Sequence, residues 1–152
     1  MSPWLRALAV MVVVVVLDQA TKAAVRSGIA QGDSDAVFPG VQFVHVRNEG
    51  VAFSRFSGGG TIVTVIVAAA LVALLAYFVT HLNKPLVWLP TGLLLGGALG
   101  NIIDRLRDGA VTDFIKLPAW PAFNVADIAI TLGVVVLLYV TERPRHGAAS
   151  DA

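Results

Sequence analysis

The sequence contains no cysteine, few charged residues and only three histidines. The absence of cysteine excludes disulfides, thiolate metal sites and a cysteine nucleophile. Charged residues make up 14% of the chain, whereas soluble domains carry about 25%. A formal net charge of +1 gives no reason to expect nucleic acid as a partner. Hydrophobic residues, in contrast, make up 57% of the chain, and the mean hydropathy of +0.78 predicts a membrane protein.

Four apolar runs predict four transmembrane helices, over residues 5–25, 61–80, 86–103 and 124–141. The third run contains Gly92, Gly96 and Gly100, whose four-residue spacing lets a neighbouring helix approach closely. The first run also fits the apolar core of a cleaved signal peptide, but Asp18 and Lys22 follow it at once without a suitable cleavage site. We therefore expect a single all-α membrane domain over residues 1–152, with the first helix retained.

The longest polar section, residues 26–60, lies between the first two apolar runs. Turn-forming residues fill its first half, and the β-rich stretch 41–47 predicts a strand, for which Ala52-Phe53 begins a partner. Residues 57–60 predict a flexible joint, and the small polar tail after Thr141 predicts disorder. The section is too small for a core of its own, so it should pack on the bundle or lie at the membrane surface.

Four spans place both termini on one side of the membrane. The positive-inside rule assigns the side richer in Lys and Arg to the cytoplasm. The termini share their side with Arg6, Lys84, Arg143 and Arg145, and the other side holds Lys22, Arg26, Arg47, Arg55, Arg105, Arg107 and Lys116. The count therefore argues against cytoplasmic termini, and the orientation has to rest on other grounds.

Two aspartates, Asp113 and Asp127, stand in otherwise apolar surroundings. Pro118 and Pro121 lie between them, so the chain bends there instead of forming one helix, and the bend can bring the two carboxylates together. Further polar residues belong to the same side of the membrane: Asp18 and Lys22, the segment 48–53, Asn101, Asp104 and Arg105, and Asn124. An acid beside a membrane span is by default a functional group that faces a protein-lined cavity.

Each of these residues also has a plain structural explanation. Asp18 and Lys22 at i,i+4 spacing predict an ion pair at a helix end, and Asn124 with Asp127 resembles a helix-capping box. Asn101 can serve helix packing, Arg105 can be a snorkelling anchor, and Asp113 alone can be a loop acid. Independent caps and anchors need not gather at one end of a bundle, however, so the cluster as a whole favours a functional site.

Two carboxyl groups held close together share a proton, so one can activate a water while the other hydrogen-bonds the carbonyl under attack. The histidines His45, His81 and His146 are too scattered for a Ser-His-Asp triad. A Ser–Lys dyad of Lys22 or Lys116 with Ser27, Ser54 or Ser57 stays open. A metal site needs more clustered ligands than the sequence offers, so we expect no metal and no cofactor.

Five motifs, in order along the chain, resemble the lipoprotein signal peptidase family, the bacterial type II signal peptidases. They are Asp18-Gln19-Ala20-Thr21-Lys22, 48–53 (Asn-Glu-Gly-Val-Ala-Phe), 96–105 (Gly-Gly-Ala-Leu-Gly-Asn-Ile-Ile-Asp-Arg), 111–115 (Val-Thr-Asp-Phe-Ile) and 123–127 (Phe-Asn-Val-Ala-Asp). Only Val51 departs from the usual family residue, Ala. The motifs extend from the first span to the last.

The resemblance implies four transmembrane helices, a small extracytoplasmic β-cradle and a short surface helix. It implies an aspartic endopeptidase of the bacterial cytoplasmic membrane with cytoplasmic termini, acting as a monomer on prolipoproteins just before a diacylglyceryl-modified Cys. It also implies membrane lipids as neighbours and inhibition by globomycin-type peptides. Asp113 and Asp127 match the catalytic aspartates, and the supporting or substrate-binding residues are Asp18, Lys22, Asn48, Gly50, Asn101, Asp104, Arg105 and Asn124.

Three other classes of function compete with this one. A proton or ion pathway predicts polar residues along the depth of several helices, but here they crowd one side. A Mg²⁺-dependent phosphatidyl-group transferase is suggested only faintly by Asp108-Gly109, because its further aspartates are missing. A purely structural membrane partner predicts that replacing Asp113 and Asp127 by Asn changes no activity.

Overall fold

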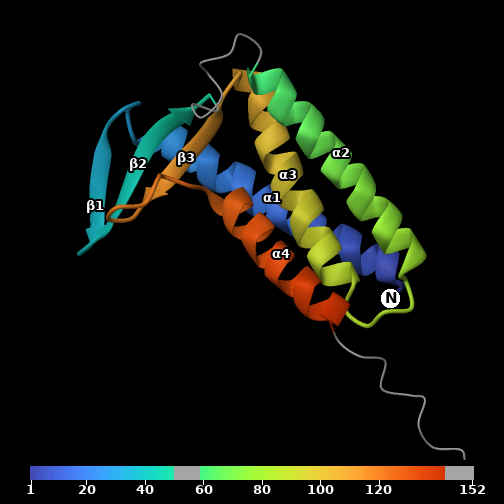
Figure 1. Ribbon diagram of the computed structural model, residues 1–152. Helices are drawn as coiled ribbons and strands as arrows, with labels where there is room; N and C mark the ends of the chain where they lie inside the picture. Colours follow the sequence, from blue (N-terminus) through green and yellow to red (C-terminus); the bar gives the residue numbers. More distant parts are fainter. Residues whose placement is uncertain (50–58, 143–152) are drawn as a thin grey trace, which may run out of the picture.

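The computed structural model describes residues 1–49 and 59–142, and within these ranges the chain forms four helices and three strands. Figure 1 shows the helices as one bundle, with the strands at the end of the bundle where α1 finishes. The elements in chain order are α1 (Pro3–Gly28), β1 (Ser34–Phe38), β2 (Val41–Asn48), α2 (Gly59–Thr80), α3 (Trp88–Asp108), β3 (Val111–Lys116) and α4 (Val125–Glu142).

Helix α3 is the centre of the bundle because its glycines let two other helices approach it. A Cβ atom added at Gly96 would lie 2.7 Å from Val14 Cβ of α1, and one added at Gly97 would lie 2.5 Å from the Ala126 carbonyl oxygen of α4. Contacts this close leave room for hydrogen only. The glycine spacing thus predicts the packing correctly, and it brings the polar residues of α1, α3 and α4 together.

Two of the four described helices, α1 and α4, are long and apolar enough to cross a membrane by length and composition. Their outward faces are apolar, with large exposed side chains that include Val12, Val13, Val16, Leu132, Val135 and Leu138. In α2 the apolar stretch Ala69–Thr80 is shorter. Helix α3 carries four charged residues near its C-terminal end: Asp104, Arg105, Arg107 and Asp108.

The strands form one antiparallel sheet in the order β1-β2-β3. Strand β2 covers the predicted strand, and Gly32, Pro39 and Gly40 lie in turns as predicted, but the interpretation of Ser34 and Asp35 as turn residues was wrong, because Ser34–Phe38 pairs with β2 as β1. Every residue of β1 is exposed, so this edge strand has no alternating burial that a sequence pattern could reveal. The predicted partner at Ala52-Phe53 lies outside the described residues, and β2 pairs instead with β1 and β3.

Three further expectations differ from the structure or fall outside it. The third helix continues to Asp108, beyond the predicted end at 103, because Gly109 (φ 73°) supplies the left-handed residue that ends it and Arg105 and Arg107 favour its last turn. Residues 1–49 and 59–142 contain no short surface helix. Gly50, the first two residues of the joint 57–60 and the tail 143–152 lie outside the described residues.

Candidate active site

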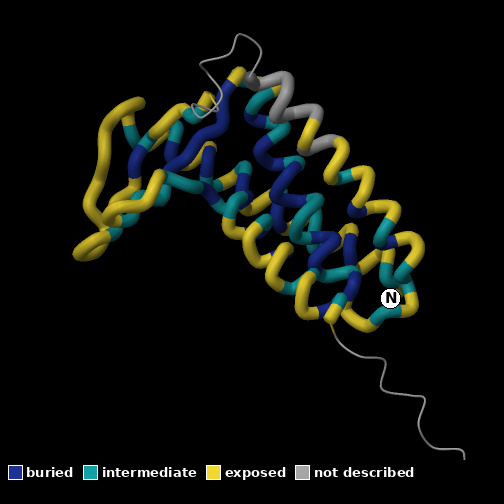
Figure 2. Tube along the Cα trace, viewed as in Figure 1, coloured by how far each residue is buried: buried dark blue, intermediate teal, exposed yellow. Residues whose placement is uncertain are grey.

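The two aspartates approach each other because the chain reverses between them. Asp113 is the third residue of β3, and Asp127 lies in the first turn of α4. Between them, Phe123 pairs with Ile115 through hydrogen bonds of 2.8 and 3.0 Å, which returns the chain to the strand it has left. The predicted bend therefore exists. Figure 2 shows buried residues along β3 and the adjoining part of α3, where the sheet meets the bundle.

Asn124 contacts both carboxyl groups. Its backbone N–H donates to Asp127 Oδ2 at 3.2 Å, and the Asp127 N–H donates to Asn124 Oδ1 at 3.0 Å, which is the predicted capping box. Its side-chain Nδ2 also donates to Asp113 Oδ1 at 2.7 Å. One fully buried residue thus caps α4 and fixes the two acids relative to each other.

Two more amides complete the shell around the carboxyl groups. Asn48 at the end of β2 donates from Nδ2 to Asp113 Oδ2 at 2.9 Å. Asn101 of α3 donates from Nδ2 to Asp127 Oδ1 at 3.0 Å. Each carboxyl group therefore accepts hydrogen bonds at both of its oxygens, and its orientation is fixed.

Lys22 determines which way the Asn101 amide faces. Its ammonium group donates to Asn101 Oδ1 at 2.9 Å, and Asn124 Nδ2 donates to the same oxygen at 3.2 Å. With the oxygen held by two donors, the Asn101 NH₂ group has to point toward Asp127. The ammonium group also pairs with Asp18 at 2.8 Å and Asp104 at 3.0 Å, and all three charged side chains are fully buried.

Asp18 and Asp104 each hold the backbone directly before one of the site aspartates. The Ala126 N–H donates to Asp18 Oδ1 at 2.9 Å, one residue before Asp127. The Thr112 N–H donates to Asp104 Oδ2 at 3.0 Å, one residue before Asp113. Since Lys22 joins the two, this ion-pair cluster fixes the positions of β3 and α4 relative to α1 and α3.

We expect that Lys22→Met destabilises the protein by roughly 3–5 kcal/mol, because it leaves two buried carboxylates without their cation. The melting temperature in detergent measures this loss. Arg107→Met is the matched control, since Arg107 pairs with Asp108 at 2.9 Å on the surface, with half of its side chain exposed. That substitution should cost at most about 1 kcal/mol. Equal losses in the two variants would contradict the role given to Lys22.

Burial and a neighbouring negative charge raise the pKa of the Asp113 carboxyl group. Its side chain is almost completely buried, and the loss of water raises its pKa to about 6. The negative charge of Asp127 raises the pKa further, while the hydrogen bonds from Asn48 and Asn124 lower it. Asp127 is partly exposed. The pair therefore combines a buried acid that holds a proton up to nearly neutral pH with a neighbour that solvent can reach.

The other predicted site residues divide into those that join the cluster and those that do not. Asp18, Lys22, Asn48, Asn101, Asp104 and Asn124 all contact the pair or the groups that hold it. Arg105 does not contact the pair in the described part of the chain, where its guanidinium group makes one hydrogen bond, to the Asn101 carbonyl oxygen at 3.4 Å. Gly50 lies outside the described residues, which contain no cluster of three metal-ligating His, Asp or Glu side chains.

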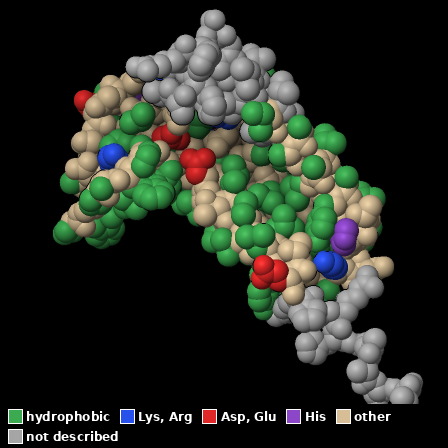
Figure 3. All heavy atoms as spheres, viewed as in Figure 1, with side chains coloured by type: hydrophobic (Ala, Val, Ile, Leu, Met, Phe, Trp, Pro, Cys, Tyr) green, Lys and Arg blue, Asp and Glu red, His purple; other side chains and the backbone are tan. Residues whose placement is uncertain are grey.

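Sequence reasoning missed three residues of this network. Gln19 Nε2 donates to Asp18, to the Gly100 carbonyl and to Asp104 at 3.0–3.2 Å, and so links α1 to α3. Arg26 Nη1 donates to Thr112 Oγ1 at 3.1 Å and lies 3.8 Å from Asp104. Gln19 shares a motif with Asp18 and Lys22, which is a usable signal. Thr112 likewise shares the motif 111–115 with Asp113, whereas nothing in the sequence marks Arg26 as a member of this network. Figure 3 shows acidic side chains at the surface where the sheet joins the helices.

Comparisons with known proteins agree on one family. Residues 10–142 match the family described as signal peptidase (SPase) II. The lipoprotein signal peptidase of Pelotomaculum thermopropionicum is 41% identical over 134 residues, which cover 86% of this chain and 87% of that protein. The lipoprotein signal peptidase of Paraburkholderia phymatum is 38% identical over 156 residues, which cover 97% and 92%.

Solved structures give the same result for the fold. A bacterial membrane enzyme determined by the in meso method at 1.9 Å resolution superposes with a TM-score of 0.82 at 33% identity, covering 90% of this chain and 92% of that one. A second bacterial membrane enzyme, at 2.3 Å resolution, gives a TM-score of 0.79, also at 33% identity, covering 93% and 92%. The arrangement of bundle and sheet is therefore shared with membrane enzymes.

Proposed function

The chain belongs to the signal peptidase II family, and on this premise we propose that it removes the signal peptide from prolipoproteins with Asp113 and Asp127 as an aspartic catalytic pair. The observation that carries the proposal is the contact of both carboxyl groups with the single residue Asn124. Two acids that share one buried bridge cannot easily both be ionised, so they hold one proton between them.

The proposed reaction uses that shared proton. Asp113 holds it, since burial and the neighbouring charge raise its pKa to about 6, and donates a hydrogen bond to the scissile carbonyl oxygen. Ionised Asp127 takes a proton from a water as the water attacks the carbonyl carbon. The tetrahedral intermediate then breaks down as Asp127 passes the proton it took from the water to the leaving amine, and Asp113 takes back the proton from the carbonyl oxygen as the C–N bond breaks. The amides of Asn48, Asn101 and Asn124 keep both carboxyl groups in place throughout, so the pair needs little reorganisation.

The bond to be cleaved lies just before a Cys that carries diacylglycerol. We place four crossings in the cytoplasmic membrane of a bacterium, with cytoplasmic termini and the pair near the outer face. A substrate with two acyl chains then enters sideways from the lipid. The protein acts without a cofactor and as a monomer, and globomycin-type peptides occupy the same site.

Several basic residues on the proposed outer side form ion pairs within the fold. Lys22 pairs with Asp18 and Asp104, and Arg107 pairs with Asp108. Arg26 also lies within 4.0 Å of Asp108. The positive-inside rule counts Lys and Arg and is not a net-charge rule, so these ion pairs do not remove the excess on the outer side, and the proposed orientation rests on the family.

We expect the purified protein to cleave a diacylglyceryl-modified prolipoprotein with a kcat/KM roughly 10²-fold above that for the unmodified precursor, because binding energy from the lipid is used at the scissile bond. Mass spectrometry of the released signal peptide measures both rates and locates the cleavage. A chelator serves as the control and should leave both rates unchanged. Equal cleavage of the two substrates would contradict the lipid specificity, and no cleavage of either would contradict the peptidase itself.

A further inference from the structure

We propose that the outer end of the sheet is a membrane anchor that inserts into the lipid leaflet beside the bundle. Two loops meet there, the turn between β1 and β2 and the loop after β3. Trp120 in the loop after β3 and Phe38 at the end of β1 are exposed, with 62% and 68% of their surfaces accessible, and Val37 of β1 is exposed with 39%. Exposed aromatic side chains in this number on one small sheet mark a surface that contacts something other than water.

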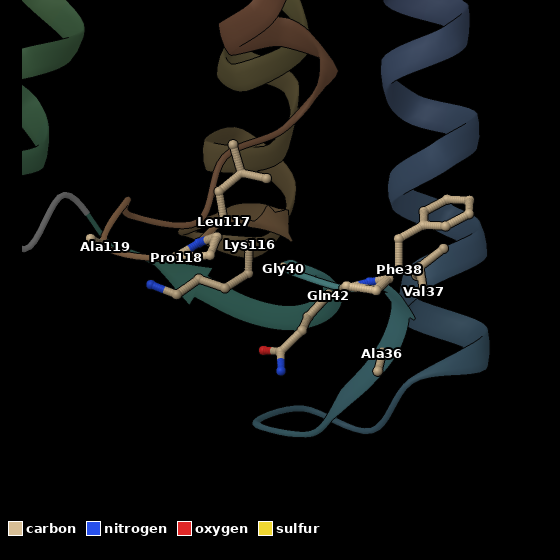
Figure 4. Close-up of a pocket in the computed structure, with 10 residues that line it drawn as sticks. Ala36, Val37, Phe38, Gly40, Gln42, Lys116, Leu117, Pro118 and Ala119 are labelled. Atoms are coloured by element: carbon tan, nitrogen blue, oxygen red, sulfur yellow. The ribbon is translucent and has the colours of Figure 1, made fainter.

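The two loops and the adjoining strand ends line an open pocket of about 550 Å³, and the lining has both apolar and polar residues. Figure 4 shows Val37, Phe38 and Leu117 on the side of the sheet toward the helices, while Gln42 and Lys116 extend the other way. A register shift between Ala36 and Phe38 interrupts the alternation of β1, and such bulges re-aim side chains. The end of the sheet is thus apolar on the bundle side and polar on the outer side.

This polarity fits a lipid leaflet better than a protein partner. A surface that lies at the membrane border needs apolar groups toward the hydrocarbon and polar groups toward the headgroups, and Trp and Lys are typical there. The Lys116 ammonium group donates to the Trp120 carbonyl oxygen at 2.7 Å, which holds the loop in its position. Figure 3 shows hydrophobic side chains along the lower left border of the sheet, next to the start of the bundle.

Chain connectivity places these residues within reach of the membrane border. Trp120 precedes Val125, the first residue of α4, by five positions, and five residues span at most about 18 Å. Helix α4 is one of the two described helices that are long and apolar enough to cross. The inference rests on that crossing and not on catalysis. An inserted anchor would hold β3, and with it Asp113, at a fixed depth.

The absence of cysteine allows a direct test. Phe38→Cys and, as the matched control on the opposite side, Gln42→Cys each carry one nitroxide spin label on the full chain, in vesicles of phosphatidylcholine and phosphatidylglycerol. Electron paramagnetic resonance compares collisions with oxygen, which concentrates in lipid, and with a water-soluble nickel chelate. We expect the oxygen-to-nickel ratio at position 38 to exceed that at position 42 at least about twofold, as for side chains buried at the interface.

Two outcomes would overturn the anchor. Equal ratios at the two positions, with nickel reaching both, would show that water surrounds the end of the sheet. Low accessibility of position 38 to both reagents would show a protein contact, and broadening between labels that disappears on dilution with lipid would identify a second copy of this chain. Melting temperatures of both labelled variants equal to that of the unlabelled protein establish that the fold is intact.

Discussion

We expect that replacing either Asp113 or Asp127 by Asn lowers kcat on a lipid-modified prolipoprotein by roughly 10⁴-fold. The physical reason is that an amide of nearly the same shape can neither accept the proton of the attacking water nor share a proton with its neighbour. Because the two acids act as one unit, we expect the double variant to lose no more than either single variant. Single-turnover cleavage with excess enzyme measures the chemical step alone.

Asp108→Asn is the matched control for these substitutions. Asp108 is an acid at the same end of the bundle, but it pairs with Arg107 at the surface. Its replacement should leave kcat within about twofold and change stability by less than about 1 kcal/mol. A nearly normal rate in Asp113→Asn or Asp127→Asn would contradict the catalytic assignment and favour a structural role for the pair.

Asn124→Ser is expected to lower kcat by roughly 10³-fold and to cost about 1–3 kcal/mol of stability, because the buried acceptors of Asn124 Nδ2 lose their donor. Serine is as good as asparagine at the start of a helix, so its hydroxyl keeps the cap of α4. It cannot reach Asp113, however, where Asn124 Nδ2 now donates at 2.7 Å. The substitution therefore separates the two roles of this residue, and differential scanning calorimetry beside a cleavage assay records both.

Asn124→Ala completes that comparison because it removes the cap as well. It should lose the same activity as Asn124→Ser and about 1 kcal/mol of stability in addition. If Asn124→Ser retained activity, the contact with Asp113 would be incidental. If Asn124→Ser lost as much stability as Asn124→Ala, then capping of α4 by Asn124 Oδ1 would not contribute to the stability of the protein.

The parts of the site that the sequence predicts well are local along the chain. Asn124 and Asp127 stand at capping-box spacing, and the structure has both reciprocal hydrogen bonds. Asp18 and Lys22 stand one helical turn apart and form an ion pair. Regular helix geometry fixes the distance between two residues at a given spacing. Residue types and their spacing are therefore sufficient to predict these contacts. The glycine spacing of α3 is informative for the same reason.

The parts that sequence reasoning misses depend on backbone groups or on distant elements. Asp18 binds the Ala126 N–H, and Asp104 binds the Thr112 N–H. Every residue except proline carries such a donor, so no pattern marks the one that is used. Arg105 stands one position after Asp104 on α3, yet among the described residues its guanidinium group hydrogen-bonds only the Asn101 carbonyl oxygen and neither carboxyl group of the pair. Strand β1 is exposed throughout and exists through its pairing with β2.

The coupling of the two acids is tested most directly by carbon-13 NMR titration of the Asp113 carboxyl carbon in the protein and in its Asp127→Asn variant. Burial and the charge of Asp127 both raise the pKa of Asp113, to about 6. We predict a midpoint near that pH in the unaltered protein and a lower one in the variant, where burial still acts but the neighbouring charge is gone. A midpoint that the substitution does not move would contradict the coupled pair.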